Sequence, residues 1–285
     1  MLPLQSSVTR KYSKIPTLFR HGQGVGIDIA GIVTQVSVDV TTFCVVDRVC
    51  GNTRGPSQIK QLAEQLNWPS FDLRLRFNKA ALPCAYLTAY QGLINHGFEP
   101  GAKVLVTGAS GGCGTAAIQL AKALGASEVV DVYSTKNEGF VKSIGADRTI
   151  DYETQSIVTG DEGYFDFVFD AASGSPGGED YLKKAKVVLT DPSKYHVTLS
   201  GPATFWIQLI CGCSPKHIAL QMTSRKCADL TAIVELLNRS DQRPAIDTVF
   251  PFTNQGVVDA FAKLKSRRTK GKLIIDVAAS LNTFH

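Results

Sequence analysis

The sequence predicts an α/β protein in which a doubly wound parallel sheet is combined with a smaller β-rich part. From about residue 80 onward, apolar strand patterns alternate with helical patterns, which is typical of a parallel sheet with helices on both faces. A glycine-rich turn joins one of these strands directly to a helix. Residues 24–49, in contrast, have strand patterns punctuated by glycines and no helical period.

The helices are expected where apolar residues recur every three to four positions, and the strands where short apolar runs are bounded by turn residues. Besides the strands within 24–49, we expect strands at 103–107, 128–132, 165–170, 196–200, 246–252 and 272–277. We expect helices at 80–97, 112–125, 138–145, 227–238 and 255–264. The tail after residue 225 has too few strands for a domain of its own, so it is expected to return and complete the N-terminal one.

The composition narrows the class of protein. The chain has 285 residues, 44% of them hydrophobic and 19% charged, which fits a globular protein large enough for two domains. No apolar run reaches the roughly 18 residues that a membrane-spanning helix needs. The net charge of +5 suits a polyanionic small ligand and is too weak to argue for nucleic acid.

Two features bear on the cellular compartment. Seven cysteines without framework spacing favour a reducing compartment over secretion. The first 27 residues are basic, free of acids and could be an organelle presequence, although a basic strand-and-loop segment of the folded domain is the simpler reading. We therefore expect a cytoplasmic protein, with a mitochondrial one as the alternative.

The strongest signal is the run KVLVTGASGGCGTAAIQLAKALG, in which a buried strand ends in a glycine turn and a helix follows at once. Gly111 and Gly112 would let the backbone approach a pyrophosphate, and Gly114 would let the helix pack closely on the strand. The amide groups and positive dipole end of the helix would favour the bound anion. The turn therefore predicts a dinucleotide site.

The strand that follows bears on the choice between NAD and NADP. An acid at its tip would bind the adenosine ribose of NAD, whereas hydroxyls and cations there accommodate the 2′-phosphate of NADP. Asp131 keeps NAD open, while Ser134 and Lys136 favour NADP. We expect NADPH.

Several runs together resemble the quinone reductases of the zinc-independent medium-chain dehydrogenase/reductase superfamily, the group of zeta-crystallin and the reticulon-interacting oxidoreductase. They are the glycine-turn run with SIGADRTIDY after it, AALPCAYLTAYQGL before it, FDFVFDAASG, and the C-terminal AFAKLKSRRTKGKLIIDV. The run GIDIAGIVTQVSVDV resembles the GroES-like strand region of that group. The likeness covers about residues 24–50 and 80–280.

The resemblance implies a Rossmann dinucleotide-binding domain at 89–225 and a GroES-like substrate domain formed by 1–88 and 226–285. Members of the group usually begin with additional residues that include two strands, so the GroES-like domain is expected to be shortened at its N-terminus. The nucleotide half is matched more closely than the substrate half.

The resemblance also implies the cofactor contacts. These are Thr88 against the nicotinamide; Ser110, Gly111, Gly112, Cys113 and Gly114 around the pyrophosphate; Ser134, Lys136 and Tyr152 at the adenosine phosphate; Ala171, Ser200 and Gly201 along the ribose and nicotinamide; and Arg267 at the 2′-phosphate. Near the substrate only Tyr12 is a plausible match, which makes it the candidate catalytic residue.

We expect no metal site. Catalytic zinc needs a converging set of Cys and His ligands, but Ile27 stands where the zinc-dependent relatives have a histidine, and only Cys84 matches a ligand position. A ketone would need a metal or an acid to stabilise the developing charge, whereas a quinone or an α,β-unsaturated carbonyl spreads it through its own conjugated system. The expected activity is therefore NADPH-dependent hydride transfer to a small-molecule quinone or enone.

The alternative to an enzyme is a nucleotide-binding regulator or RNA-binding paralogue with little or no turnover. Six cations between Lys263 and Lys272 could serve RNA, but a solvated helix end beside a cofactor phosphate explains them better, so RNA binding is not expected. The apolar stretch 197–220 leaves a homodimer possible.

Overall fold

The computed structural model describes residues 5–7, 27–33, 35–36, 41, 44–52, 64–65, 80–173, 180–191, 196–201, 207–208, 211 and 217–277. The chain divides into two compact units. The first, here called the β-rich unit, contains Met1–Ala85, Arg225–Thr231 and Pro244–His285. The second, the parallel-sheet unit, contains Tyr86–Ser224 and Ala232–Arg243.

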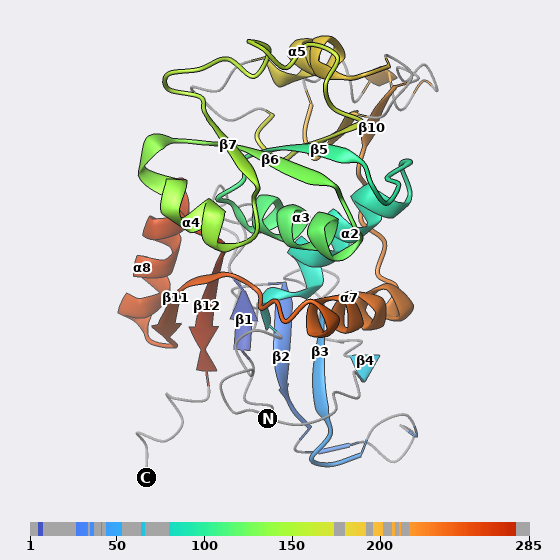
Figure 1. The fold of residues 1–285 in the computed structure, drawn as a ribbon. Coiled ribbons are helices and arrows are strands. Elements are labelled where there is room, and N and C mark those ends of the chain that lie inside the picture. The colour runs from blue at the N-terminus through green and yellow to red at the C-terminus, as the bar shows by residue number, and fades with distance from the viewer. Residues whose placement is uncertain are drawn as a thin grey trace. The chain divides into compact units, whose positions relative to one another are not determined.

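The parallel-sheet unit is built on six strands that all run in the same direction. They are β5 (Lys103–Thr107), β6 (Glu128–Tyr133), β7 (Arg148–Asp151), β8 (Phe167–Asp170), β9 (His196–Thr198) and β10 (Ile218–Leu220). Their order is β10-β9-β8-β5-β6-β7 (Figure 1), which is the order of dinucleotide-binding folds. The predicted doubly wound sheet is confirmed. The chain leaves β5 toward β6 and later returns on its other side as β8, so the topological switch point lies between β5 and β8.

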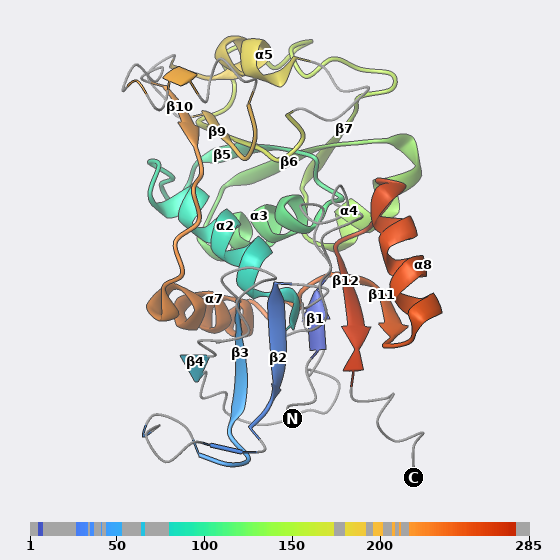
Figure 2. The same ribbon diagram turned by 180° about the vertical axis from the view of Figure 1, so that it is seen from behind.

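Helices cover both faces of this sheet. The helical elements are α2 (Pro83–Ile94), α3 (Gly112–Ala123), the 3-10 turn η3 (Thr135–Asn137), α4 (Glu138–Ser143), α5 (Tyr181–Val188) and α7 (Cys227–Arg239), of which α7 belongs partly to each unit. Helices α2 and α3 lie on one face and α5 on the other, in both views (Figures 1 and 2). Gly92 of α2 is in close contact with Phe169 of β8, which leaves no room for a larger side chain at this crossing.

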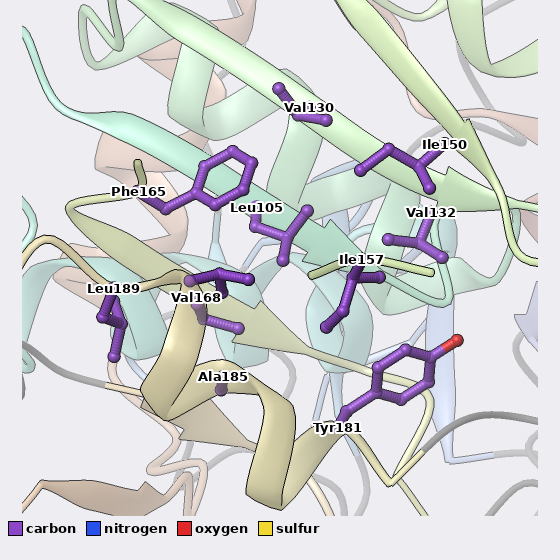
Figure 3. Close-up of a cluster of buried hydrophobic side chains, with 11 residues drawn as sticks. Leu105, Val130, Val132, Ile150, Ile157, Phe165, Val168, Tyr181, Ala185 and Leu189 are labelled. Atoms are coloured by element: carbon purple, nitrogen blue, oxygen red, sulfur yellow. The ribbon is translucent and has the colours of Figure 1, made fainter. Parts of the chain in front are cut away.

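The core on the α5 face is a cluster of buried apolar side chains (Figure 3). It consists of Leu105, Val130, Val132, Ile150, Ile157, Phe165, Val168, Tyr181, Ala185, Val188 and Leu189. Burying a large apolar side chain contributes roughly 1.5–3 kcal/mol, so this cluster fixes the strands rigidly in register. The strand ends that could carry a ligand are thereby held in place.

The β-rich unit contains a second six-stranded sheet, of order β11-β12-β1-β2-β3-β4. Its strands are β1 (Gln5–Ser7), β2 (Asp28–Ile32), β3 (Arg48–Asn52), β4 (Glu64–Gln65), β11 (Ile246–Pro251) and β12 (Lys272–Asp276). Because β12 pairs with β1, the C-terminal residues complete the sheet that the first strands begin. Helix α8 (Asn254–Lys265) is capped by the Thr253 hydroxyl, which accepts a hydrogen bond from the Gly256 amide.

An apolar contact and a buried ion pair stabilise this second sheet. Ala260 and Leu264 of α8 pack on Leu273 and Ile275 of β12. The Lys272 Nζ lies 3.1 Å from the Asp28 carboxylate, and both side chains are buried.

Among the described residues, no helix combines the length and the apolar character that a membrane crossing requires.

Candidate functional site

The glycine turn after β5 forms the centre of the candidate site. Gly108 has φ +67, a conformation that favours glycine, and the Gly111 amide donates a 3.0 Å hydrogen bond back to the Gly108 carbonyl. Helix α3 begins at Gly112 with Gly111 as its N-cap. A Cβ on Gly114 would lie 2.2 Å from the Gly108 carbonyl oxygen, so this position admits only glycine. The turn and the helix are therefore packed as closely as backbone permits.

The outer part of this turn is open to solvent. Ser110, Gly111, Gly112 and Cys113 are partly exposed, whereas Gly114 is buried beneath them. The first amides of a helix have no partner within the helix, and the glycine N-cap supplies no side chain to bind them. Together with the positive end of the helix dipole, this arrangement can hold an anion such as a pyrophosphate.

The ends of β6 and β7 bring a second group of predicted residues together. Ser134 and Lys136 follow β6, and the Tyr152 amide after β7 donates to the Tyr133 carbonyl at 3.1 Å. Lys136 and Tyr152 are both exposed, so both are accessible to a ligand at this edge. The turn residue Thr135 donates its hydroxyl hydrogen to Asp151, which fixes the loop after β6 to the end of β7.

Asp131 does not lie where an acid would bind the ribose of NAD. It is the fourth residue of β6, is fully buried, and neither of its carboxylate oxygens has a hydrogen-bond partner in another described residue. Burial raises the pKa of Asp131 from its ordinary 3.8 to about 7. Asp131 therefore does not supply an acid at the end of the strand, because the strand continues for two residues beyond it, and the choice between NAD and NADP stays a prediction.

On the other side of the switch point, β8 and β9 end in a polar edge. Ala171 follows β8, and its amide donates to the Thr107 carbonyl at 3.2 Å. Ser200 and Gly201 follow β9, and the Thr198 hydroxyl donates to the Ser200 carbonyl at 2.6 Å. These residues thus lie on the same carboxyl edge as the glycine turn, which is where open parallel sheets bind their ligands.

Asp170 organises this edge, although the sequence did not single it out. Its buried carboxylate accepts the Thr107 hydroxyl at 2.5 Å and the Ala172 and Ser173 amides at 3.0 and 2.9 Å. Burial alone would raise the pKa of this carboxyl, but the His196 ring and the hydroxyls of Ser173 and Thr107 lower it by more, so the pKa lies below its usual range. Its position at the end of a predicted strand was a signal that could have identified it.

Thr88 lies in the middle of α2, and its side chain is hydrogen-bonded to the segment after β10. Its hydroxyl is 2.7 Å from that of Thr223. Nearby, the Gln91 amide group forms two 2.9 Å hydrogen bonds with the backbone of Ser224. The exposed segment after β10 is therefore fixed to α2. Thr223 could not have been found from the sequence, since the two hydroxyls are 135 residues apart.

Comparisons with known proteins agree with this architecture. A family model described as zinc-binding dehydrogenase matches residues 144–275. The chain is 34% identical over 262 residues to the 2-methylene-furan-3-one reductase of Solanum lycopersicum, covering 88% of this chain and 62% of that protein. It is 30% identical over 300 residues to a zinc-type alcohol dehydrogenase-like protein of Schizosaccharomyces pombe, covering 96% and 83%. The chain belongs to the medium-chain dehydrogenase/reductase superfamily.

Further relatives in this superfamily of oxidoreductases include quinone and alkenal/one reductases, as the resemblance indicated. The chain is 32% identical over 262 residues to the chloroplastic NADPH-dependent alkenal/one oxidoreductase of Arabidopsis thaliana, covering 88% of this chain and 63% of that protein. It thus spans less than two thirds of the tomato and Arabidopsis proteins. The quinone oxidoreductase of Coxiella burnetii has the same fold, with a TM-score of 0.75 at 23% identity over 96% of this chain and 89% of that one.

The described structure does not test two of the residues inferred from the superfamily resemblance. Arg267 lies in the β-rich unit just after α8, exposed and with φ +59, and its contact with a 2′-phosphate stays a prediction. Tyr12 lies outside the described residues, as does much of the N-terminal region in which the shortening was expected.

The described residues do not offer the zinc ligands found in some members of this superfamily. No group of three or more His, Cys, Asp or Glu side chains among them converges in a way that could hold a metal ion. Cys84, the one match to a ligand position, lies at the start of α2. The glycine turn can accommodate the pyrophosphate of a dinucleotide, and the expected lack of a zinc site stays a prediction.

Proposed function

We propose that the protein is an NADPH-dependent oxidoreductase that transfers a hydride to a quinone or an α,β-unsaturated carbonyl without zinc. The proposal depends above all on the open glycine turn at the start of α3, where a pyrophosphate can approach the backbone of the partly exposed Gly111 and Gly112 while Gly114 lets the helix pack closely beneath them. The relatives named as reductases of furanones and alkenals or enones support the acceptor class.

NADPH is favoured over NADH by the residues after β6. With Asp131 buried inside the strand, the tip carries Tyr133 followed by Ser134 and the exposed Lys136. A hydroxyl and a cation there suit a 2′-phosphate, whereas NAD-binding strands of this kind place an acid at that point.

Hydride transfer to a conjugated acceptor needs no catalytic group beyond the bound cofactor and the residues that orient it. NADPH supplies the hydride when bound, and the acceptor spreads the developing charge through its conjugated system. The protein then has to bind and orient the cofactor, which the glycine turn and the strand ends can do. A simple ketone would require a positioned acid or metal in addition.

The proposal is tested by titrating the purified protein with NADPH and NADH and following the fluorescence of the reduced nicotinamide. Turnover is then measured with benzoquinone, naphthoquinone and an alkenal, with and without a chelator. We expect tighter binding of NADPH and chelator-resistant turnover. Absence of dinucleotide binding, or strong inhibition by the chelator, would refute the proposal, and binding without turnover would favour the regulatory alternative.

A substitution at Lys136 tests the cofactor preference directly. Lys136→Ala should weaken NADPH binding several-fold, roughly 1 kcal/mol, and leave NADH binding unchanged, because only NADPH carries the second phosphate. Lys183→Ala is the matched control, since it removes the same charge from α5 on the opposite face of the sheet. Equal weakening of both cofactors by Lys136→Ala would contradict this assignment.

A further inference from the structure

The carboxylate of Asp170 is an unusual feature for the end of a β-strand, since it is fully buried and surrounded by donors. Besides the Thr107 hydroxyl and the amides of Ala172 and Ser173, it accepts the Ser173 hydroxyl. The His196 Nε2 lies 3.4 Å from its Oδ2, and that ring is buried as well.

The groups around this carboxylate come from three segments, two of which supply its hydrogen bonds and the third the nearby His196 ring. Thr107 is the last residue of β5, directly before the glycine turn, and Ala172 and Ser173 belong to the turn after β8. His196 opens β9. One carboxylate thus connects both strands that flank the predicted ligand crevice with the strand next to them.

The turn that Asp170 holds lies directly against the glycine turn. A Cβ on Gly108 would be 3.0 Å from the Ala171 carbonyl carbon and 3.1 Å from the Ala172 amide nitrogen. The Ala171–Ala172 peptide therefore forms a wall of the glycine turn at its first residue. If the Ala171–Ser173 turn moved, the shape of this part of the crevice would change with it.

Fold stability alone does not explain this network. Taking a carboxylate out of water costs several kcal/mol, and replacing buried ion pairs by apolar side chains is often neutral or stabilising. The same unit contains a second buried acid with strong partners, Asp161. Its carboxylate accepts hydrogen bonds from both terminal nitrogens of Arg148, at 2.7 and 3.0 Å. Arg148 is the first residue of β7, so that pair lies at the amino edge of the sheet, away from the glycine turn. Of these two acids, Asp170 is the one that lies on the carboxyl edge, beside the glycine turn.

We propose that Asp170, with His196 behind it, is a positioning residue for the nicotinamide half of the dinucleotide. It acts by holding the Ala171–Ser173 turn against Gly108, so that this wall is preformed before the cofactor binds. The inference depends on the proposed function, because it presupposes that the carboxyl edge binds NADPH. The adenosine end would be bound at the ends of β6 and β7, which lie on the other side of β5 from this turn.

The test compares two probes that share the adenosine end and the pyrophosphate. NADPH carries the nicotinamide, whereas 2′-phospho-ADP-ribose lacks only that ring. We expect Asp170→Asn and His196→Leu to weaken NADPH binding about tenfold, because the preorganised wall is lost, while 2′-phospho-ADP-ribose binding stays within about twofold. His196→Gln, which keeps a donor, should restore most of the NADPH affinity.

Circular dichroism checks that each variant is folded, and two further variants serve as comparisons in the binding assay. Ser173→Ala removes one donor from a partly exposed turn and should show the same selective effect in a smaller measure. Asp161→Asn is the matched control, because it disturbs a buried acid at the other edge and should change the affinity for neither probe.

The outcomes separate the two proposals. Failure of the wild-type protein to bind NADPH would overturn both of them. Normal binding by the wild type, combined with variants that lose both probes equally or lose neither, would overturn the positioning role of Asp170 and leave the proposed function intact.

Discussion

Replacing Asp131 by alanine should make the stability of the protein less dependent on pH. Asp131 lies in the middle of β6 with its side chain fully buried, and burial raises its pKa from 3.8 to about 7. Between these pH values the folded protein keeps a proton that the unfolded chain releases. The free energy of unfolding therefore falls as the pH rises through this window.

The size of the effect follows from the two pKa values. Each pKa unit corresponds to about 1.36 kcal/mol, so a shift of roughly three units removes about 4 kcal/mol of stability between pH 4 and pH 7. Below pH 3.8 the carboxyl is neutral in both states and costs no ionisation energy. Above about pH 7 it is ionised in both states, so the loss is complete.

The assay is urea unfolding of the wild type and Asp131→Ala, followed by circular dichroism at several pH values. The variant should gain about 4 kcal/mol relative to the wild type between pH 4 and pH 7, and the cost of the cavity cancels because it is the same at each pH. Val129→Ala, on the same strand and equally buried, should differ from the wild type by a constant amount. A constant difference for Asp131→Ala as well would refute the reasoning.

Three other substitutions test the local geometry. Val46→Gly should raise the free energy of unfolding by about 1 kcal/mol in urea, since Val46 is exposed and adopts φ +70 in a tight turn. Gly114→Ala should abolish NADPH binding in a fluorescence titration, because its Cβ would lie 2.2 Å from the Gly108 carbonyl oxygen. Lys272→Met should lower the free energy of unfolding by about 3–5 kcal/mol, since it leaves the buried Asp28 carboxylate without this cation.

Each of these substitutions has a matched control in the same chain. Val45→Gly, at the neighbouring exposed position of the same turn, should not stabilise the protein. Gly139→Ala should leave NADPH binding intact, because a Cβ there meets no atom within 4 Å. Lys142→Met should have little effect on unfolding, because its pair with Glu138 is exposed on the surface of α4. Equal effects of a substitution and its control would contradict the corresponding explanation.

The sequence predicted those parts of the fold and site that depend on local chemistry. The strand, glycine turn and helix from Lys103 to Ala123 are encoded in one continuous run, so both the elements and the anion site could be anticipated. Strands β7 and β10 were missed although β8 and β9 are equally short and were predicted. All residues of β8 and β9 are buried, whereas only Ile150 of β7 and no residue of β10 is, so the missed strands are not the buried apolar runs by which the others were found. Helix α5 had a usable signal, since Asp180 caps it and Tyr181, Ala185 and Val188 share its buried face.

Contacts between distant segments could not be predicted in this way. The pairing of Thr88 with Thr223 depends on how the segment after β10 passes α2, and no residue near either hydroxyl encodes it. The wall that the Ala171–Ala172 peptide forms beside Gly108 depends likewise on β8 lying next to β5.

The two buried acids of the parallel sheet show why residue type alone did not identify the functional positions. In the middle of a strand the backbone amides of the neighbouring residues are used by the adjacent strands, so burial raises the pKa of Asp131 and no hydrogen bond from another described residue offsets it. At the carboxyl end of a parallel strand the chain turns, and the amides of Ala172 and Ser173 become available to Asp170, whose pKa is lowered. An acid that ends a strand can therefore remain ionised and organise a ligand edge, whereas an acid two residues inside a strand is a cost to stability. Because a shift of two residues in the predicted strand end exchanges these two outcomes, the role of such an acid follows from the exact end of the strand, which only the structure supplies.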